Sequence, residues 1–277
     1  MGHYNEFVGL GVAGNFALHL EQAGEIEDFK EVVTDDPNGP KGVFPFYIPG
    51  REDFLGIYPL SNDTIVLPKE ECNVQPEPEV ALICDLEYDA DGKVTQITPR
   101  FFGAYNDCSL RREGAPKISF KKNWGESTKG LSPKLIPIDR FEEGGIMDSY
   151  RIASFLRRDG SLLRYGEDVE LRGYSYFYTK LIDWLKNQIN TQGDTGPLET
   201  VAEYLKSAGL PKQAVISIGA TRYTNYGETH FLQEGDEVIV VVYDNNLYCM
   251  NPILMMANRG GLDVDGVSAL VQKVVRA

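Results

Sequence analysis

The sequence predicts a mixed α/β fold that is rich in β-structure and carries helices at its periphery. Short apolar runs rich in β-branched residues, at 80–84, 214–219 and 237–243, are typical of buried strands. Turn-forming clusters at 89–92 and 157–160 separate such runs at the intervals expected between short strands. Helical periodicity is limited to a few segments, so we expect the helices to cover a sheet.

The apolar opening stretch from Phe7 to Leu20 is expected to form a buried strand and a turn. It is rich in glycine, follows Glu6 and lacks the basic leader of a signal peptide. No later window approaches the roughly 20 continuous apolar residues that cross a bilayer. We therefore expect a cytoplasmic protein that does not act on membranes.

Three segments are expected to be helical. Residues 176–189 and 198–209 have the strongest helical periodicity, and the second segment ends on a glycine that suits a helix cap. A third short helix is expected near 266–275. Because no repeat or linker divides the chain, we expect one domain over residues 1–277, with a helical insertion at about 176–209.

Composition narrows the classes of partner and of metal. The chain has 27 Lys plus Arg against 41 Asp plus Glu, and its net charge of -14 opposes binding to nucleic acid. The four cysteines form no Cys-x-x-Cys pair and only three histidines occur, so a zinc centre would have to gather distant residues. Any bound metal is therefore expected to prefer oxygen ligands.

Two glutamates enter the apolar run that begins at Val80. Side chains two apart on an extended strand share a face, so Glu77 and Glu79 are expected to project together, while Pro78 marks a strand start or edge. Two carboxylates held this close require a cation, or a proton on one of them. The alternative is a solvated acidic loop, which is the usual setting of an isolated pair.

Another acidic residue follows the apolar run at 101–105. We expect this run to be a strand that delivers Asp107 at its end, where the residue completes a set of three carboxylates with Glu77 and Glu79. Hard cations such as Mg²⁺ or Mn²⁺, with Ca²⁺ as an alternative, bind such oxygens and keep positions open for water or substrate. The other interpretation is that Asn106 and Asp107 only form a turn.

His19 lies two residues before Glu21, in a segment expected to turn from strand into helix. A histidine can act as a base near neutral pH, and a nearby carboxylate can hold its tautomer. The alternative is a hydrogen-bonded packing histidine between two leucines.

Taken in order, these and further motifs resemble those of the fumarylacetoacetate hydrolase superfamily, over roughly residues 8–250. The motifs are Asn15–His19 (family pattern NYxxHxxE), PFYIPG from Pro45 (PxFxKP), DTIVLP at 63–68 (DxIVLP), EPEVALI at 77–83 (ExELAVVIG), NDCSLR at 106–111 (NDxSAR), Trp124 with Lys129 (WxxxK loop), LIPI at 135–138 (PLGPWIV), AVISIGATRY at 214–223 (VILTGTPxG) and FLQEGDEVIVVV at 231–242 (FLxPGDxVEVEI). Each motif alone is weakly specific, but their common order makes coincidence improbable.

The resemblance implies a β-roll folded around a metal-centred cleft, and a homodimer. It implies three metal ligands, Glu77, Glu79 and Asp107. It implies three catalytic residues: His19 as the base that activates water, Glu21 as its assistant, and Lys129 to stabilise negative charge. It implies that three residues bind a small dicarboxylic or 2-oxo acid substrate, namely Asn106, Arg111 and Thr221.

Several positions depart from the family pattern. Gly14 stands where the family often has arginine, Gln22 replaces the glutamate three residues after the histidine, and Ala220 departs from the TGTP loop. Glu21 is an imperfect substitute for that glutamate. The metal ligands are retained more faithfully than the substrate pocket, which indicates a different substrate or weakened catalysis.

The leading interpretation is a metal-dependent hydrolase that cleaves a carbon–carbon bond in a 1,3-dicarbonyl or acylpyruvate-type 2-oxo acid. A decarboxylase or tautomerase is the second interpretation, because an enolate is common to all three reactions. A third is a non-catalytic metabolite-binding protein that keeps the fold, which the departures at Gly14, Gln22 and Ala220 favour.

Overall fold

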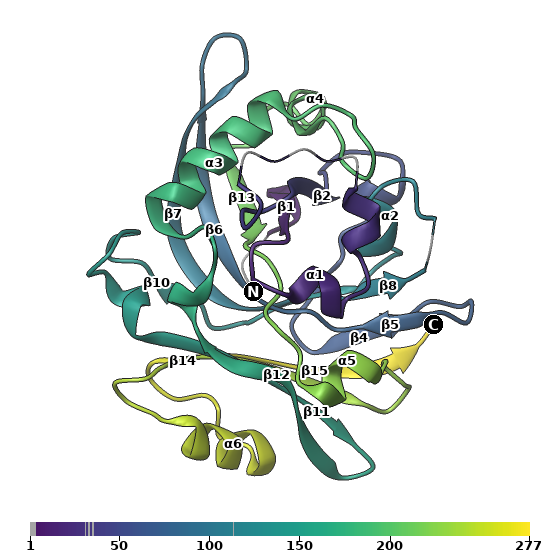
Figure 1. Cartoon of the computed structure of the whole chain (residues 1–277), viewed down its shortest axis with the longest axis vertical. Helices are drawn as coiled ribbons and strands as arrows, with labels where there is room; N and C mark the ends of the chain where they lie inside the picture. Colours follow the sequence, from purple (N-terminus) through teal and green to yellow (C-terminus); the bar gives the residue numbers. More distant parts are fainter. Residues whose placement is uncertain (1–3, 31, 33, 35, 113) are drawn as a thin grey trace.

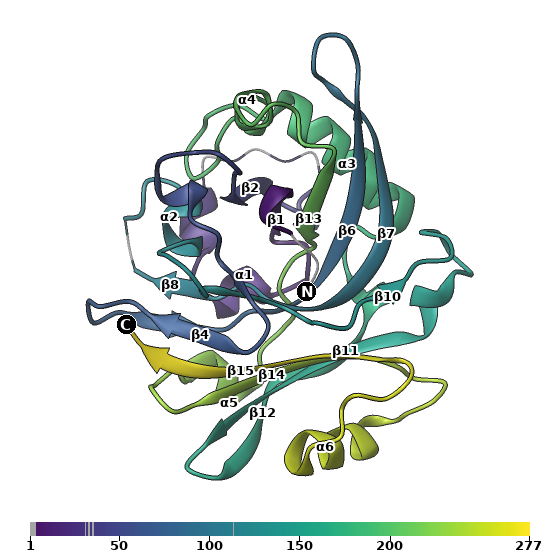
Figure 2. The same cartoon turned by 180° about the vertical axis from the view of Figure 1, so that it is seen from behind.

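A computed structural model of the chain describes residues 4–30, 32, 34, 36–112 and 114–277. As predicted, the fold is mixed α/β and rich in β-structure, with two large sheets and a few helices (Figures 1 and 2). The larger sheet curls through the upper part of the molecule in Figure 1, and the second sheet lies across the lower part.

The strands are β1 (Val8–Ala13), β2 (Gly42–Tyr47), β3 (Leu60–Ser61), β4 (Thr64–Leu67), β5 (Asn73–Gln75), β6 (Pro78–Tyr88), β7 (Val94–Asn106), β8 (Ser109–Arg111), β9 (Lys129–Leu131), β10 (Ile136–Pro137), β11 (Tyr150–Arg158), β12 (Ser161–Glu170), β13 (Gln213–Ser217), β14 (Glu237–Asp244) and β15 (Val267–Arg276). The α-helices are α1 (His19–Gln22), α2 (Ser119–Lys122), α3 (Tyr178–Thr191), α4 (Val201–Ser207), α5 (Asn225–Thr229) and α6 (Met250–Arg259). Short 3-10 turns are η1 (Tyr4–Glu6), η2 (Ile26–Phe29), η3 (Phe54–Gly56), η4 (Ile146–Ser149) and η5 (Leu171–Gly173).

Strand pairing places β1 between β2, from the N-terminal part of the chain, and β13, from its C-terminal part. Among the described residues, the larger sheet has the order β2-β1-β13-β6-β7-β9-β3, with β10 added on β7. The second sheet has the order β12-β11-β14-β15-β4, and β5 pairs with β8 alone. Strand β1 runs parallel to β13, whereas β6 is antiparallel to both β13 and β7. The strand runs predicted at 80–84, 214–219 and 237–243 lie in β6, β13 and β14, although β13 already ends at Ser217.

The two helices predicted from strong periodicity are confirmed as α3 and α4. Helix α3 buries Leu181, Leu185 and Ile189, which lie four residues apart on one face. Both helices pack against strands of the larger sheet.

The third predicted helix is wrong, because residues 267–276 form strand β15 between β14 and β4. Its buried positions alternate with more exposed ones from Ser268 to Val274, which is the period of a strand. Helix α6 was not predicted. It packs through Ile253 and Ala257 on the face of the second sheet that points away from the larger sheet (Figures 1 and 2).

The β6–β7 hairpin brings the predicted acidic residues to one place. Pro78 pairs with Asn106 in this hairpin, so Glu77 and Asp107 are neighbours at its end, and the Asp107 amide donates to the Glu77 carbonyl (3.0 Å). The chain that leaves β13 follows the same end, because the Thr221 amide donates to the Pro78 carbonyl (3.1 Å).

Asn15 ties the segment after β1 to the end of β13. Its Nδ2 donates to the carbonyls of Ile218 (2.8 Å) and Tyr176 (2.9 Å), and its Oδ1 accepts from the Tyr176 amide (2.8 Å). These bonds fix the chain four residues before His19, which therefore reaches the end of the β6–β7 hairpin.

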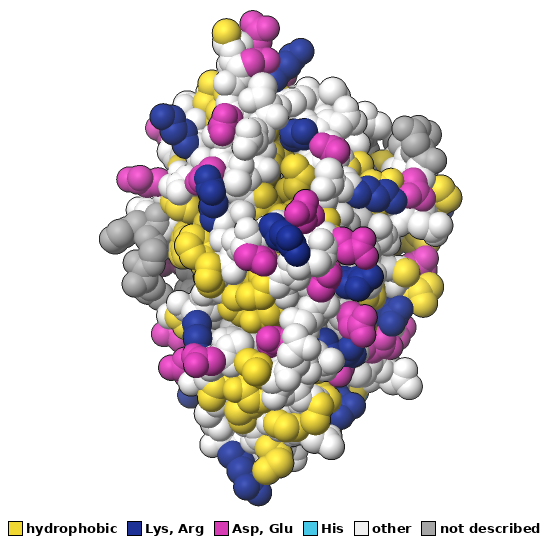
Figure 3. Space-filling model, turned by 90° about the vertical axis from the view of Figure 1, so that its left-hand side faces the viewer, with side chains coloured by type: hydrophobic (Ala, Val, Ile, Leu, Met, Phe, Trp, Pro, Cys, Tyr) yellow, Lys and Arg dark blue, Asp and Glu magenta, His cyan; other side chains and the backbone are white. Residues whose placement is uncertain are grey.

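Surface charge is of both signs. On the face in Figure 3, acidic and basic side chains are interspersed between apolar ones, and the basic side chains do not gather into one patch. Within the described part of the chain, no helix combines the length and the apolar character needed to cross a membrane.

Candidate metal centre

The structure brings Glu77, Glu79 and Asp107 together. One carboxylate oxygen of each lies within 4.8 Å of the others, and the residues are only 3%, 2% and 0% exposed. Glu77 directly precedes β6, Glu79 is the second residue of β6, and Asp107 directly follows β7. This arrangement agrees with the predicted shared face and the predicted acid at a strand end, and the burial excludes a solvated loop.

Basic side chains surround the three carboxylates. The Nζ atom of Lys122 lies 2.7 Å from Glu77 Oε2 and 2.7 Å from Asp107 Oδ2. Lys129, which is fully buried, places its Nζ 3.0 Å from Asp107 Oδ1 and also donates to the Cys108 carbonyl. Burial opposes ionisation of Asp107, but Lys122 and Lys129 outweigh it and hold the pKa of this carboxyl below its ordinary value.

Glu79 differs from its two neighbours, because no ion pair among the described residues reaches it. Its Oε2 accepts from the Gly219 amide (3.1 Å). Burial first, and then the charges of Asp107 and Glu77, raise the pKa of Glu79 well above its ordinary value. Without a metal the surroundings therefore favour the protonated form of this carboxyl, and a bound cation would favour its ionisation.

The donor set fits a hard divalent cation. Within the described residues, Glu77 Oε1 and both carboxylate oxygens of Asp107 are buried without a hydrogen bond. The ammonium or guanidinium groups of Arg111, Lys122 and Lys129 lie within 3.0 Å of these oxygens. Buried oxygens without hydrogen bonds are costly, and carboxylate oxygens are the ligands that Mg²⁺ and Mn²⁺ prefer. Glu77, Glu79 and Asp107 are therefore the residues that would hold such a cation.

His19 is buried beside these carboxylates. Its Nδ1 lies 3.0 Å from the carbonyl oxygen of Thr221, which only accepts, so Nδ1 carries the proton and Nε2 keeps a lone pair. The distance of 4.0 Å from Nε2 to Glu77 Oε2 is too long for a direct hydrogen bond but suits one bridging water. Burial lowers the pKa of His19 despite the charge of Glu77, so the imidazole is neutral near neutral pH.

Glu21, the predicted assistant of His19, lies outside the site. It is exposed, and no contact among the described residues joins it to His19, because residues two apart on a helix point to different sides. Gln22 instead binds the backbone of Tyr223 through both ends of its amide (3.1 and 2.9 Å). A glutamate could not donate there. The Thr221 carbonyl, and not an acid, therefore orients His19.

The three predicted substrate-binding residues all lie at the site, but their side chains contact other parts of the protein. Asn106 accepts from the Glu77 amide (3.1 Å) and donates to Gln272 (3.0 Å). The Thr221 hydroxyl donates to the Pro78 carbonyl (3.2 Å). Arg111 places Nη2 2.8 Å from Glu77 Oε1. In the structure these three side chains hold Glu77 and the nearby backbone in place. Their contact with a substrate stays a prediction.

Sequence reasoning missed Glu25, Lys122 and Tyr223. Glu25 Oε1 lies 2.7 Å from Arg111 Nη1, and Arg111 also donates to the Tyr223 hydroxyl (3.1 Å). Burial opposes ionisation of Glu25, but Arg111 outweighs it, with Lys122 and Lys121, and the pKa of Glu25 falls to about 2. Glu25 and Arg111 are 86 positions apart, and no local motif marks either contact.

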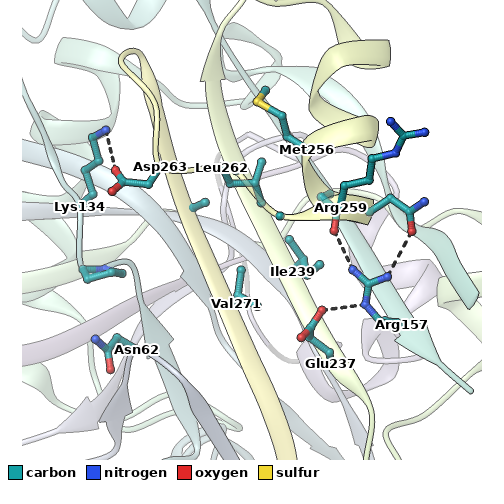
Figure 4. Close-up of a pocket in the computed structure, with 16 residues that line it drawn as sticks. Asn62, Lys134, Arg157, Glu237, Ile239, Met256, Arg259, Leu262, Asp263 and Val271 are labelled. Carbon is teal, nitrogen blue, oxygen red and sulfur yellow. Dashed lines mark hydrogen bonds and ion pairs between the residues drawn. The ribbon is translucent and has the colours of Figure 1, made fainter. Parts of the chain in front are cut away.

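The space at the centre is small. The three carboxylates, His19 and Lys122 line a cavity of about 20 Å³, which is room for about one ion or one water molecule. A far larger cavity of about 850 Å³ lies between α6 and the second sheet (Figure 4). None of the carboxylate cluster lines it, and its basic residues are largely paired, as between Lys134 and Asp263. Of these two cavities, the small one therefore contains the candidate metal centre.

We expect Glu25→Gln to remove an acid-sensitive part of the stability. The folded-state pKa of about 2 lies below the ordinary value of 4.5, so the ionised carboxylate stabilises the fold above about pH 4.5, and this contribution is lost as the pH falls towards 2. The shift corresponds to ~3 kcal/mol at most. Denaturant unfolding from pH 7 to pH 3 should show the gap between wild type and Glu25→Gln shrinking. The exposed Glu27→Gln is the matched control, and a gap that does not change with pH would contradict the assignment.

Comparison with known proteins supports the fold. Searching curated protein sequences finds no match. Solved structures with a similar fold include Cg1458 with inhibitor (15% identity, TM-score 0.58, 98% of this chain and 77% of that chain). They include 2-keto-3-deoxy-D-arabinonate dehydratase complexed with magnesium and 2,5-dioxopentanoate (12% identity, TM-score 0.51, 98% of this chain and 73% of that chain). A protein from Yersinia pestis CO92 described as a fumarylacetoacetate hydrolase family protein also matches (13% identity, TM-score 0.51, 97% of this chain and 93% of that chain).

These likenesses establish the fold of the fumarylacetoacetate hydrolase superfamily, as the ordered motifs predicted. At the level of sequence, the model of one family matches residues 25–274, which is most of the chain. The chain therefore belongs to the family of unknown function DUF5718, and it carries the fumarylacetoacetate hydrolase fold.

Proposed function

We propose that the chain is a metal-dependent enzyme that acts on a small 2-oxo acid or 1,3-dicarbonyl compound. The observation that carries the proposal is the buried cluster of Glu77, Glu79 and Asp107 with the free Nε2 of His19 beside it. A dehydratase with this fold is complexed with magnesium and 2,5-dioxopentanoate, which supports the same classes of metal and ligand here. Within these classes, hydrolytic cleavage of a carbon–carbon bond is the leading reaction.

Each side chain has a defined part in this proposal. A divalent cation held by the carboxylates supplies Lewis-acid polarisation of a carbonyl oxygen. His19 takes a proton from water at Nε2, because the Thr221 carbonyl holds its other nitrogen. Lys129 offers a positive charge that stabilises negative charge on the carbon fragment. Arg111 keeps Glu77 in place.

Substrate entry requires the small cavity to open. At about 20 Å³ the cavity is too small for a 2-oxo acid. Its wall includes Gly14, Leu20, Phe29, Ile118 and Ala220. The proposal therefore includes a movement of this wall, in which the segment after β1 separates from the turn before α2.

Experiments can distinguish carbon–carbon cleavage from the other functions that the same site could have. Decarboxylation and tautomerisation need the same polarised carbonyl, so NMR identification of products from a panel of acylpyruvates and 2-oxo acids separates them from cleavage. A metabolite-binding protein without turnover is favoured by one observation, since Gln22 supplies no acid to His19. Binding without turnover across the panel would support it. The homodimer and the cytoplasmic location stay predictions.

We expect Glu79→Ala and Asp107→Ala to lose almost all affinity for Mg²⁺ and Mn²⁺, because each variant removes a ligand from a set of three. Isothermal calorimetry measures this directly. A cation at about 100 times its Kd should also stabilise the wild type by ~2.7 kcal/mol and raise its Tm. Glu87→Ala is the matched control, because Glu87 is exposed on the same strand. Unchanged affinity in both ligand variants would exclude the site.

We expect His19→Ala to lose turnover by about 100-fold or more while it keeps its cation, because His19 is proposed as a base and not as a ligand. Steady-state rates and calorimetry on the same preparation separate the two effects. His230→Ala serves as the control, since His230 stacks on Tyr226 away from the cluster. Full turnover in His19→Ala on a verified substrate would make the base assignment wrong.

A further inference from the structure

We propose that Lys122 is an internal cation that competes with the divalent metal for Glu77 and Asp107, so that metal binding requires its ammonium group to move aside. The inference rests on the proposed function, because it concerns the same three carboxylates. It goes beyond that proposal by assigning to this chain a built-in regulator of metal affinity.

The position of the ammonium group is the first step of the argument. Nζ of Lys122 lies 2.7 Å from Glu77 Oε2 and 2.7 Å from Asp107 Oδ2, so it bridges two of the three ligands. Of the three proposed ligands, Lys129 contacts only Asp107, and Arg111 contacts only Glu77. Among the ion pairs of the described residues, only that of Lys122 joins two ligands, as a metal would.

Lys122 is also held firmly in this position. It is the last residue of α2, and its side chain is only 4% exposed. The ammonium lies 5.3 Å from the centroid of the Phe44 ring, which adds a cation–π contact. The group is therefore part of the site and not a surface side chain that happens to reach it.

Space and charge prevent both cations from sharing the two oxygens. The cavity lined by Lys122 and the carboxylates has room for about one ion. Mg²⁺ binds oxygens at about 2.1 Å, which would bring it against the ammonium in a buried site where like charges repel strongly. With Arg111 and Lys129 as further partners, Glu77 and Asp107 already have basic groups against them without a metal. A metal must therefore displace Lys122 to bind tightly.

The experiment is calorimetric titration with Mn²⁺ alone on wild type and three variants. Lys122→Met removes the charge and keeps an apolar chain of similar length against Phe44, and we expect its Mn²⁺ affinity to rise about tenfold or more. Lys122→Arg keeps the charge and should bind no more tightly than wild type. Lys134→Met makes the same charge change at a partly exposed ion pair beside the larger cavity and should leave affinity unchanged.

Thermal unfolding gives a second readout that does not depend on activity. Metal-free Lys122→Met should have a lower Tm than wild type, since Glu77 and Asp107 lose a buried partner. Mn²⁺ should then raise the Tm of this variant more than that of wild type. If Lys122→Met does not fold, Lys122→Gln, which keeps a donor without the charge, makes the same comparison.

The outcomes separate the two proposals. Tighter Mn²⁺ binding in Lys122→Met or Lys122→Gln supports competition, including the case in which wild type binds too weakly to measure. Equal or weaker binding in these variants beside a wild type that binds overturns the competition and leaves the metal site standing. Absence of Mn²⁺ binding in every folded variant overturns the metal site itself, and this inference with it.

Discussion

The burial of three carboxylates within 4.8 Å of one another, at the end of the β6–β7 hairpin, is the constraint on which the rest of the site depends. Like charges cannot be buried this closely without counter-charge or protons. The protein supplies counter-charge, because Lys122, Lys129 and Arg111 contact Glu77 and Asp107. Glu79 accepts one backbone bond, and burial with the neighbouring charges raises its pKa, which favours its protonated form. The three basic side chains beside the cluster therefore offset the charge of its carboxylates.

The scaffold that holds this cluster is built from central strands and not from loops. β6 lies between β13 and β7 in the larger sheet, and Asn106 is bonded both to the Glu77 amide and to Gln272 of β15 in the second sheet. His19 is held by the carbonyl of Thr221, just beyond β13. Because these bonds are buried, the carboxylates and the imidazole have little freedom. In the proposal, the movement that admits a substrate comes from the apolar part of the cavity wall, which includes Leu20, Phe29 and Ile118.

Sequence alone predicts what depends on local spacing and fails where contacts are distant. The two-residue spacing of Glu77 and Glu79 and the acid after the run at 101–105 were enough to locate the cluster, and the order of motifs to predict the fold. The pairing of Glu25 with Arg111 joins residues 86 positions apart, and Gln22 binds Tyr223, so neither contact has a local signal. The lack of a local signal for distant contacts also explains why a helix was wrongly predicted at 266–275. The apolar residues at 266–275 fit either period, and pairing with β14 and β4 decides for a strand.

The central claim is that the buried carboxylates bind one divalent cation beside a neutral His19. A crystal structure of the protein with Mn²⁺, measured at an X-ray energy at which manganese scatters anomalously, tests it most directly. The account predicts one anomalous peak within about 2.2 Å of oxygens from Glu77, Glu79 and Asp107, with the ammonium of Lys122 moved away from two of them. A peak at other residues only, or no peak at millimolar Mn²⁺, would contradict the account.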